Sequence, residues 1–365
     1  MKKVKILLLS GFLGAGKTTT ALRLISHVER KGLSAVYIAN DQGSLLIDTE
    51  MGEGKGIVTR QVGNGCFCCR FEDLIEAVQG LIAEKQPDVI IAEAVGSCTD
   101  LVSTVIRPLK KYYGAQLEVL PFPVVLDGNR YADMQRLLGT RLSYLFTKQI
   151  EDAQIIGLSK SDSIPDDDRA AFIAALHQQY PAKPVITYSS QTGDGIAEFA
   201  DALIFTPQLS ADTLTPLEID YETYGAAEAD MAWVDISLDL TANDRLIAPD
   251  VWIRTCLENL RSAPSLSNRV IGHIKIALGN GVTLTKASLV DIHKEIQFDE
   301  RCCDPAEACV ALINARAEGQ PAEIYAIVEA AVKHTASLTE SQVIFREHNA
   351  FSPGMPTPVH RILQD

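Results

Sequence analysis

The chain has 365 residues, of which 47% are hydrophobic, and it carries a formal charge of -14 at pH 7. A chain of this length can bury two separate cores. Its acidic balance argues against a nucleic-acid or anionic-membrane partner, because such partners require a basic surface. Neither a long apolar run nor a signal-peptide pattern is present, so we expect a cytoplasmic protein with no membrane span.

Up to about residue 203, short apolar segments alternate with amphipathic stretches, which is typical of a parallel sheet with helices on both faces. Strands are predicted at residues 4–9, 35–39, 89–92, 123–126, 154–158 and 185–188. Helices are predicted at residues 17–31, 71–84, 130–138 and 166–179. We therefore expect residues 1–204 to form an α/β domain with a doubly wound, mainly parallel sheet.

The second part of the chain has a different pattern. From residue 205 to 230 the periodicity is lost among Pro, Thr and acidic residues, and we interpret this stretch as a linker. Strands are then predicted at residues 232–240, 270–278, 282–286 and 308–314, with helices at 249–261 and 321–334. This order fits a smaller α+β domain of ferredoxin-like type over residues 231–340. Residues 341–365 are expected to be an irregular tail.

A glycine-rich segment, Gly-Phe-Leu-Gly-Ala-Gly-Lys-Thr at residues 11–18, follows the first predicted strand and opens the first predicted helix. In this context the spacing indicates a phosphate-binding loop, with a chance glycine-rich turn as the alternative. Lys17 would reach the β- and γ-phosphates, and the Thr18 hydroxyl would ligate Mg²⁺. The predicted nucleotide-binding positions here are Gly11, Gly14, Ala15, Gly16, Lys17, Thr18 and Thr19.

Two further segments at strand ends are candidate switches, whose conformation would depend on the bound nucleotide. Asn-Asp-Gln-Gly at residues 40–43 ends the second strand, and Asp48 follows shortly after it. Glu93, at the end of the third strand, would contact Mg²⁺ through water or position the attacking water, and the Gly96 N–H would sense the γ-phosphate. Lys17, Asp48 and Glu93 are therefore the candidate catalytic residues. Capping of the next helix is the alternative role for Glu93.

Recognition of the base is expected at Ser-Lys-Ser-Asp, residues 159–162, which resembles the Asn-Lys-x-Asp element of GTPases with Ser159 in the Asn position. Asp162 would accept hydrogen bonds from guanine, and the same carboxylate would reject adenine. The Lys160 stem would cover the ring. In GTPases the Asn amide normally ties this loop to the phosphate loop. Because Ser159 replaces that Asn, an ordinary helix cap is the alternative role for this segment. Ser190 belongs to the companion base loop.

Three of the eight cysteines fall within four residues, at Cys66, Cys68 and Cys69. In a reducing compartment such clustering favours metal or redox chemistry over disulfides. Three thiolates form a soft anionic site suited to Zn²⁺ or Co²⁺ and leave a fourth ligand position open. Gly63 and Gly65 are expected to bend the loop, because adjacent side chains diverge on a strand. Buried packing thiols are the alternative.

The roles of four other cysteines stay open. Cys98 would approach the cluster if the second switch moved, and otherwise it fills the core. Cys302 and Cys303, together with Cys309, form either a second soft site or part of the packing of the second domain.

The order of these motifs resembles that of CobW-like GTPases, a family related to the nickel chaperones UreG and HypB. The shared elements are the phosphate loop, Asn-Asp-x-Gly with a later Asp, Cys-x-Cys-Cys, and the segments at residues 93–96, 124–127, 149–153 and 159–162. The resemblance covers about the first 205 residues, and Cys-x-Cys-Cys between the switches marks the CobW-like branch. The histidine-rich tract of many metal-storing members is absent, which implies delivery from a single site.

The resemblance implies a P-loop GTPase that uses GTP/GDP and Mg²⁺ and handles Zn²⁺ or Co²⁺ at its cysteines. We accordingly expect a GTP-hydrolysing metallochaperone or metal insertase, whose partner is a client metalloprotein or a protein of a corrinoid pathway. Relatives often dimerise with nucleotide, so a homodimer is a further expected partner. The alternative is a GTPase chaperone that assembles or reactivates a corrinoid enzyme, in which the thiols contact the client or its cofactor.

Overall fold

The computed structural model describes residues 2–43, 56–130, 140–280, 283–301 and 304–364. These divide into two compact units. The first contains the described residues up to Gln42, those from 56 to Ala227, and the segment 355–364. The second contains Gly43 and the described residues from Glu228 to Gly354. No described helix is both long enough and apolar enough to cross a membrane.

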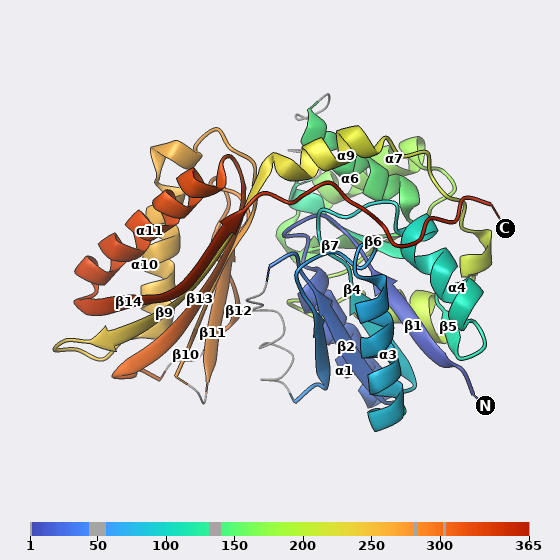
Figure 1. Cartoon of the computed structure of the whole chain (residues 1–365), viewed down its shortest axis with the longest axis horizontal. Coiled ribbons are helices and arrows are strands. Elements are labelled where there is room, and N and C mark those ends of the chain that lie inside the picture. Colours follow the sequence, from blue (N-terminus) through green and yellow to red (C-terminus); the bar gives the residue numbers. More distant parts are fainter. Residues whose placement is uncertain (1, 44–55, 131–139, 281–282, 302–303, 365) are drawn as a thin grey trace. The chain divides into compact units, whose positions relative to one another are not determined.

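The first unit is built on parallel strands (Figure 1). Its strands are β1 Val4–Leu9, β2 Ala35–Asn40, β3 Thr59–Val62, β4 Val89–Glu93, β5 Leu117–Val119, β6 Pro123–Asp127, β7 Ile155–Ser159 and β8 Val185–Thr187. They pair in the orders β3-β2-β4-β1-β5 and β6-β7-β8, and a parallel bridge from Ser10 to Val124 connects the two runs. The carboxyl ends of β1, β2, β4, β6 and β7 therefore lie along one edge, where α/β sheets bind ligands.

Helices cover this sheet. They are α1 Lys17–Arg30, α3 Phe71–Lys85, α4 Arg107–Tyr113, α6 Arg141–Asp152, α7 Asp166–Gln179, α8 Ile196–Ala200 and α9 Tyr221–Ala229, with short turns η1 Val102–Ile106, η2 Ser161–Ser163, η3 Asp201–Phe205 and η4 Ala211–Thr213. α1 buries Ala21, Leu24, Ile25 and Val28, the spacing of one helix face. Each large side chain buried in this way contributes roughly 1.5–3 kcal/mol, which holds α1 against the sheet.

All six strands predicted for this unit are present, each with ends within one residue of the prediction. The helices predicted at residues 17–31, 71–84 and 166–179 are present as α1, α3 and α7. The helix predicted at residues 130–138 lies almost entirely outside the described residues. The strands β3 and β5 and the helices α4, α6 and α8 were not predicted. β3 is a short edge strand whose middle residues, Arg60 and Gln61, are polar, so it lacks the apolar run of a central strand.

The second unit is an antiparallel sheet with two helices on one face (Figure 1). Its elements are β9 Met231–Ala242, α10 Pro249–Arg261, η5 Pro264–Leu266, β10 Ile271–Gly279, β11 Leu284–Leu289, β12 Gln297–Glu300, β13 Ala308–Glu318, α11 Pro321–Leu338 and β14 Ser341–Phe351. The sheet order is β12-β11-β10-β13-β9-β14. Within it, β10-β13-β9-β14 has the ferredoxin-like order, and β11 and β12 extend one edge. The predicted fold class, an α/β unit followed by a smaller α+β unit, is confirmed.

The structure differs from the predicted organisation in two places. The stretch read as a linker contains α9, and the first unit continues through it to Ala227. The stretch expected to be irregular from residue 341 begins with β14, which pairs with β9. β14 was missed because it is an edge strand with most of its side chains exposed, so its apolar alternation is weak. Residues 355–364 have no regular secondary structure.

Candidate nucleotide site and thiol cluster

The glycine-rich segment lies between β1 and α1, as predicted. Gly11, Gly14 and Gly16 have φ angles of 144°, 76° and 90°, which side chains with a Cβ rarely adopt. A Cβ at Gly11 would also lie 2.2 Å from the carbonyl oxygen of Val125. The glycines therefore let the loop turn tightly into the N-terminus of α1, where backbone N–H groups and the helix dipole favour an anion.

Lys17, Thr18 and Glu93 converge where α1 begins and β4 ends. Lys17 Nζ donates a hydrogen bond to the carbonyl oxygen of Phe12 at 3.3 Å and lies 4.0 Å from Glu93 Oε1. Thr18 Oγ1 donates to the same carboxylate oxygen at 3.1 Å, and the Tyr37 hydroxyl donates to Oε2. Glu93 thus faces the phosphate loop and does not cap a helix. The contribution of Tyr37 was missed, because a tyrosine in an apolar strand reads as a core residue.

The structure describes Gly96 of the second switch candidate but not Asp48, which follows the first. A Cβ at Gly96 would lie 2.8 Å from the backbone nitrogen of Leu13, so this glycine packs directly against the phosphate loop. Arg130 donates to the Leu13 carbonyl oxygen at 2.9 Å and fixes the same part of the loop. Asp48 lies outside the described residues, and its catalytic role stays a prediction.

Ser159 connects the predicted base loop to the phosphate loop. Its hydroxyl donates to the carbonyl oxygen of Ala15 at 2.8 Å and lies 3.2 Å from that of Leu126. The tie that GTPases usually make through an Asn amide is therefore made here by a shorter hydroxyl group. The loop is therefore tied to the phosphate loop without the Asn, and the preference for guanine stays a prediction.

Lys160 and Asp162 take separate positions in the same loop. Lys160 Nζ donates to the carbonyl oxygen of Gly14 at 3.1 Å and forms an ion pair with Asp127 at 2.8 Å. Its stem therefore runs along the phosphate loop. Asp162 is exposed in η2, where a carboxylate can meet a nucleotide base from solvent. Base recognition by these two side chains stays a prediction.

The companion base loop is attached to α1. Thr20 Oγ1 lies 2.9 Å from the Tyr188 hydroxyl and 3.3 Å from Ser190 Oγ. Arg23 donates to the carbonyl oxygen of Ser190 at 2.6 Å. Thr19, in the first turn of α1, is half-buried. These contacts hold the loop around Ser190 next to the N-terminus of α1.

The three clustered cysteines lie on a tight turn that leads into α3. The N–H groups of Cys69 and Arg70 both donate to the carbonyl oxygen of Cys66, at 3.0 and 2.9 Å. This turn brings together side chains that would diverge on a strand. The chain bends before it at Asn64 and Gly65, which have φ angles of 58° and 148°. Of the two glycines expected to bend the loop, Gly65 does so, and Asn64 supplies the second positive φ.

The sulfur atoms of the cluster are close enough to share one ion. All three Sγ atoms lie within 4.8 Å of one another, with 2.7 Å between Cys66 and Cys68 and 3.8 Å between Cys68 and Cys69. Ligand sulfurs around a tetrahedral zinc ion are roughly 3.8 Å apart, given a Zn–S distance of about 2.3 Å. Hydrogen bonds from Cys68, Cys69 and Cys98 lower the pKa of Cys66 despite its burial. The donor set fits a soft divalent cation.

Cys98 lies beside the cluster, whose three mutually close sulfur atoms are those of Cys66, Cys68 and Cys69. It is fully buried, and its side chain hydrogen-bonds with the thiols of Cys66 and Cys68. Cys98 is thus buried next to the cluster without a movement of the second switch, and its role as a ligand stays a prediction. Cys309 is buried in β13, whereas the pair at residues 302–303 lies outside the described residues.

Asn40 links the first switch candidate to the thiol loop. Its Nδ2 donates to the carbonyl oxygens of Val62 and Gly65, at 2.8 and 2.7 Å, and its Oδ1 accepts the Phe67 N–H at 3.0 Å. Asn40 is the last residue of β2, so the first switch candidate starts where the thiol loop is held. The sequence singled out Asn40 as part of a switch but gave no sign of this contact.

α6 fixes the segment that follows β4. Gln149 Nε2 donates to the carbonyl oxygens of Gly96 and Cys98, both at 2.9 Å. The Asp152 carboxylate accepts the N–H groups of residues 101 and 102, at 2.9 and 3.3 Å. One helix therefore holds the backbone of both the candidate γ-phosphate sensor, Gly96, and Cys98.

Asp152 gives the stability of this segment a defined pH dependence. Burial and the nearby Asp100 raise its pKa from 3.8 to about 7. The folded state then binds a proton that the unfolded state has lost between about pH 4 and 7, so stability should fall as pH rises through this range and level off above it. We expect Asp152→Asn, which still accepts both N–H groups, to flatten this profile in urea unfolding.

The exposed Asp167→Asn is the matched control for this experiment, because its side chain lies at the surface of α7. It should leave the profile of the parent chain unchanged. Parallel pH profiles for the parent chain and Asp152→Asn would show that Asp152 does not take up the proton.

These features define a P-loop nucleotide-binding protein with a cluster of thiols between its switch segments. The family model "CobW/HypB/UreG, nucleotide-binding domain" matches residues 5–187, half of the chain, and the chain belongs to this family. The resemblance inferred from the sequence is thereby confirmed.

Two curated relatives and one solved structure illustrate the similarity. The chain is 26% identical over 225 residues to the zinc chaperone CobW of Pseudomonas aeruginosa, covering 52% of this chain and 58% of that protein. It is 34% identical over 109 residues to the zinc-regulated GTPase metalloprotein activator 1 of Dictyostelium discoideum, covering 26% and 22%. The Zn(II)-bound YjiA GTPase from E. coli aligns with 92% of this chain and 99% of that chain, with 14% identity and a TM-score of 0.37. The chain thus spans less than two thirds of the length of either curated relative.

Proposed function

We propose that this protein is a GTP-hydrolysing metallochaperone that carries Zn²⁺ on its thiol cluster and transfers it to a client metalloprotein. The observation that carries the proposal is the attachment of the cluster to both switch candidates. Asn40 holds the loop at one side, and Cys98 joins it from the segment after Gly96. The names of the two curated relatives, a zinc chaperone and a zinc-regulated GTPase, support zinc as the ion.

Hydrolysis would take place at the edge formed by β1 and β4. The phosphate loop would bind the β- and γ-phosphates through backbone N–H groups, and the Lys17 ammonium would offset their charge. Thr18 and Glu93 would hold Mg²⁺, which would stabilise charge on the transferring phosphoryl group. Glu93 would also orient water, since its carboxylate is fixed by Thr18 and Tyr37. Selection of guanine would rest on Asp162.

The ion would be cargo held by sulfur. Cys66, Cys68 and Cys69 supply three thiol ligands, and Cys98 supplies a fourth group in contact with two of them. Cys69 is half-buried whereas the other three are buried, so a client would reach the ion from the Cys69 side. Co²⁺ would fit the same donors.

Coupling between nucleotide and metal is the central expectation. A switch that moves with the γ-phosphate would move Asn40 or Cys98 and so change the sulfur positions. We expect zinc affinity to differ between the GTP- and GDP-bound forms by about tenfold or more, equivalent to about 1.4 kcal/mol, and the effect must be reciprocal. Competition titration with a zinc chelator, in GDP and in a non-hydrolysable GTP analogue, measures it.

Equal zinc affinities in the two nucleotide states would leave a static metal site on a GTPase. Parent protein that binds no metal while still binding a client through the same cysteines would favour the other function, a chaperone whose thiols contact the client. Metal analysis of untagged protein distinguishes these outcomes.

A further inference from the structure

Residues 355–364, which we call the strap, lie beside the thiol loop within the first unit. The Thr357 N–H donates to Cys69 Sγ at 3.3 Å, and the Val359 N–H donates to the carbonyl oxygen of Cys68 at 2.9 Å. Further along, the Ile362 N–H donates to a carbonyl oxygen of η1 at 2.9 Å. The strap therefore contacts two of the cluster residues through its own backbone.

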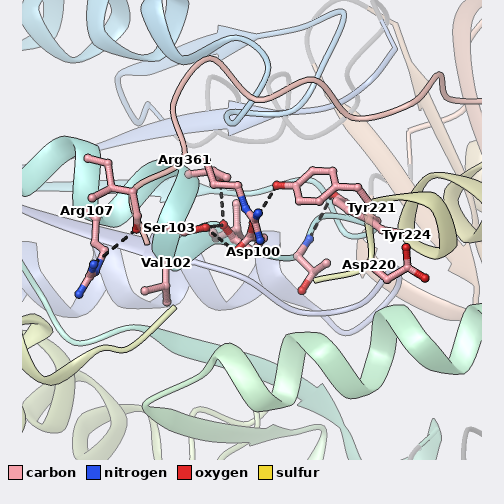
Figure 2. Close-up of polar contacts among 12 residues, drawn as sticks. Asp100, Val102, Ser103, Arg107, Asp220, Tyr221, Tyr224 and Arg361 are labelled. Atoms are coloured by element: carbon pink, nitrogen blue, oxygen red, sulfur yellow. Dashed lines mark hydrogen bonds and ion pairs between the residues drawn. The ribbon is translucent and has the colours of Figure 1, made fainter. Parts of the chain in front are cut away.

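An ion pair at Asp100 anchors the strap (Figure 2). Arg361 Nε lies 2.9 Å from Asp100 Oδ2, and the Tyr221 hydroxyl donates to the same oxygen at 2.7 Å. The guanidinium carbon of Arg361 lies 4.9 Å from the centre of the Tyr221 ring. The Ser103 hydroxyl donates to the other oxygen of Asp100. Asp100 is completely buried, and a buried carboxylate is stable only with partners, so Arg361 is held firmly.

Side-chain contacts before Thr357 and after Val359 also hold the strap in place. The His360 ring meets Phe71, the first residue of α3, edge-on with 4.9 Å between ring centres. At the other end, a Cβ at Gly225 in α9 would lie 2.1 Å from the sulfur of Met355, so that glycine leaves the space that the strap fills. The strap is thus fixed on either side of Cys68 and Cys69.

We infer that the strap covers the thiol cluster and that Arg361 is the positioning residue that holds the cover in place. A backbone N–H that donates to a thiolate stabilises its charge and orients it as a ligand. Lifting the strap would remove this donor from Cys69 and open the half-buried side of the cluster. Asp100 follows Cys98 by two residues, so movement of the second switch would act on the anchor and the cluster together. The metal-transfer part of this inference rests on the proposed function.

Arg361→Ala tests the cover in metal-free protein. Loss of the anchor should raise the rate at which iodoacetamide alkylates Cys69 by about tenfold, measured by mass spectrometry of the peptide, because the thiol becomes exposed. Arg361→Lys keeps the charge and should restore a slow rate in part. Arg346→Ala is the matched control, since it removes an exposed arginine that pairs with Asp239 in the second unit. It should leave the rate unchanged.

A pair of substitutions at Thr357 tests the contact between the strap and the sulfur of Cys69. Thr357→Pro removes the N–H and places the ring Cδ where that hydrogen pointed at Cys69 Sγ, so it both deletes the hydrogen bond and moves the strap away from the sulfur. Thr357→Ala keeps the N–H and changes only the side chain. In zinc-loaded protein we expect Thr357→Pro to release zinc to a chelator about tenfold faster than the parent chain, and Thr357→Ala to match the parent chain.

The two measurements separate the inference from the proposed function. A parent chain that binds no zinc would reject the metallochaperone, yet faster alkylation of Arg361→Ala would still support the cover. Alkylation rates of Arg361→Ala equal to those of the parent chain would overturn the cover whatever the metal does. If Arg361→Ala unfolds, as judged by circular dichroism, the Thr357 pair decides, and equal zinc release from its two members would overturn the inference.

Discussion

Lys17→Ala is expected to abolish GTP hydrolysis while leaving the fold intact. The ammonium is the charged group of the phosphate loop, and loss of one preorganised charge contact at a developing anion costs about 100-fold or more in turnover. Glu93 keeps its hydrogen bonds from Thr18 and Tyr37 without Lys17, so no buried carboxylate is left unpartnered. Phosphate release measures turnover, and circular dichroism monitors the fold.

Lys85→Ala is the control for this substitution, because Lys85 is exposed at the end of α3. It should hydrolyse GTP at the rate of the parent chain. Turnover of Lys17→Ala equal to that of the parent chain would reject the assignment of residues 11–18 as the phosphate-binding loop.

Simultaneous replacement of Cys66, Cys68 and Cys69 by serine should abolish tight zinc binding. Serine keeps the size of the side chain but offers a hydroxyl group, which is a poor zinc ligand at neutral pH, so affinity should fall on the order of a thousandfold or more. The effect of zinc on nucleotide affinity should disappear with it. GTP binding itself should persist, because Lys17 and Asp162 are untouched. Metal analysis and nucleotide titration give the two readouts.

Cys256→Ser is the matched control, since this thiol is buried in α10 and burial raises its pKa to about 12. Its loss should leave zinc binding unchanged. Stoichiometric, tight zinc in the triple variant would place the metal site elsewhere in the chain.

The fold of the first unit could be predicted well because its central strands are short, buried and almost entirely apolar. β1, β4 and β6 have no exposed face, so their composition alone marks them. β3 and β14 lie at sheet edges, where polar side chains conceal the alternation. α6 was missed for a related reason, since it buries Gln149 and Asp152 to bind backbone groups of another segment.

The candidate site could also be predicted only in part, because some of its features are runs of neighbouring residues and others are contacts between distant residues. The phosphate loop, the thiols and the base loop are runs of neighbouring residues whose spacing shows in the sequence. The hydrogen bond from Phe67 to Asn40 and the ion pair between Asp100 and Arg361 join residues far apart in the chain, and their residue types alone predict no partner. The prolines at positions 356 and 358 indicated only that the strap is not helical.

The hydroxyl of Ser159 has a consequence for how long a nucleotide stays bound. It carries one hydrogen for two carbonyl oxygens, those of Ala15 and Leu126, whereas an Asn amide carries two. The side chain of Ser159 therefore ties the base loop to the phosphate loop by one neutral hydrogen bond. Such a bond is worth about 0.5–1.5 kcal/mol, which favours the attached position of the base loop roughly two- to tenfold. Lys160 adds its hydrogen bond to Gly14 and its ion pair with Asp127, and a bound base would add further contacts to this loop. We therefore expect Ser159 to shorten the residence time of a bound guanine nucleotide relative to an Asn at this position.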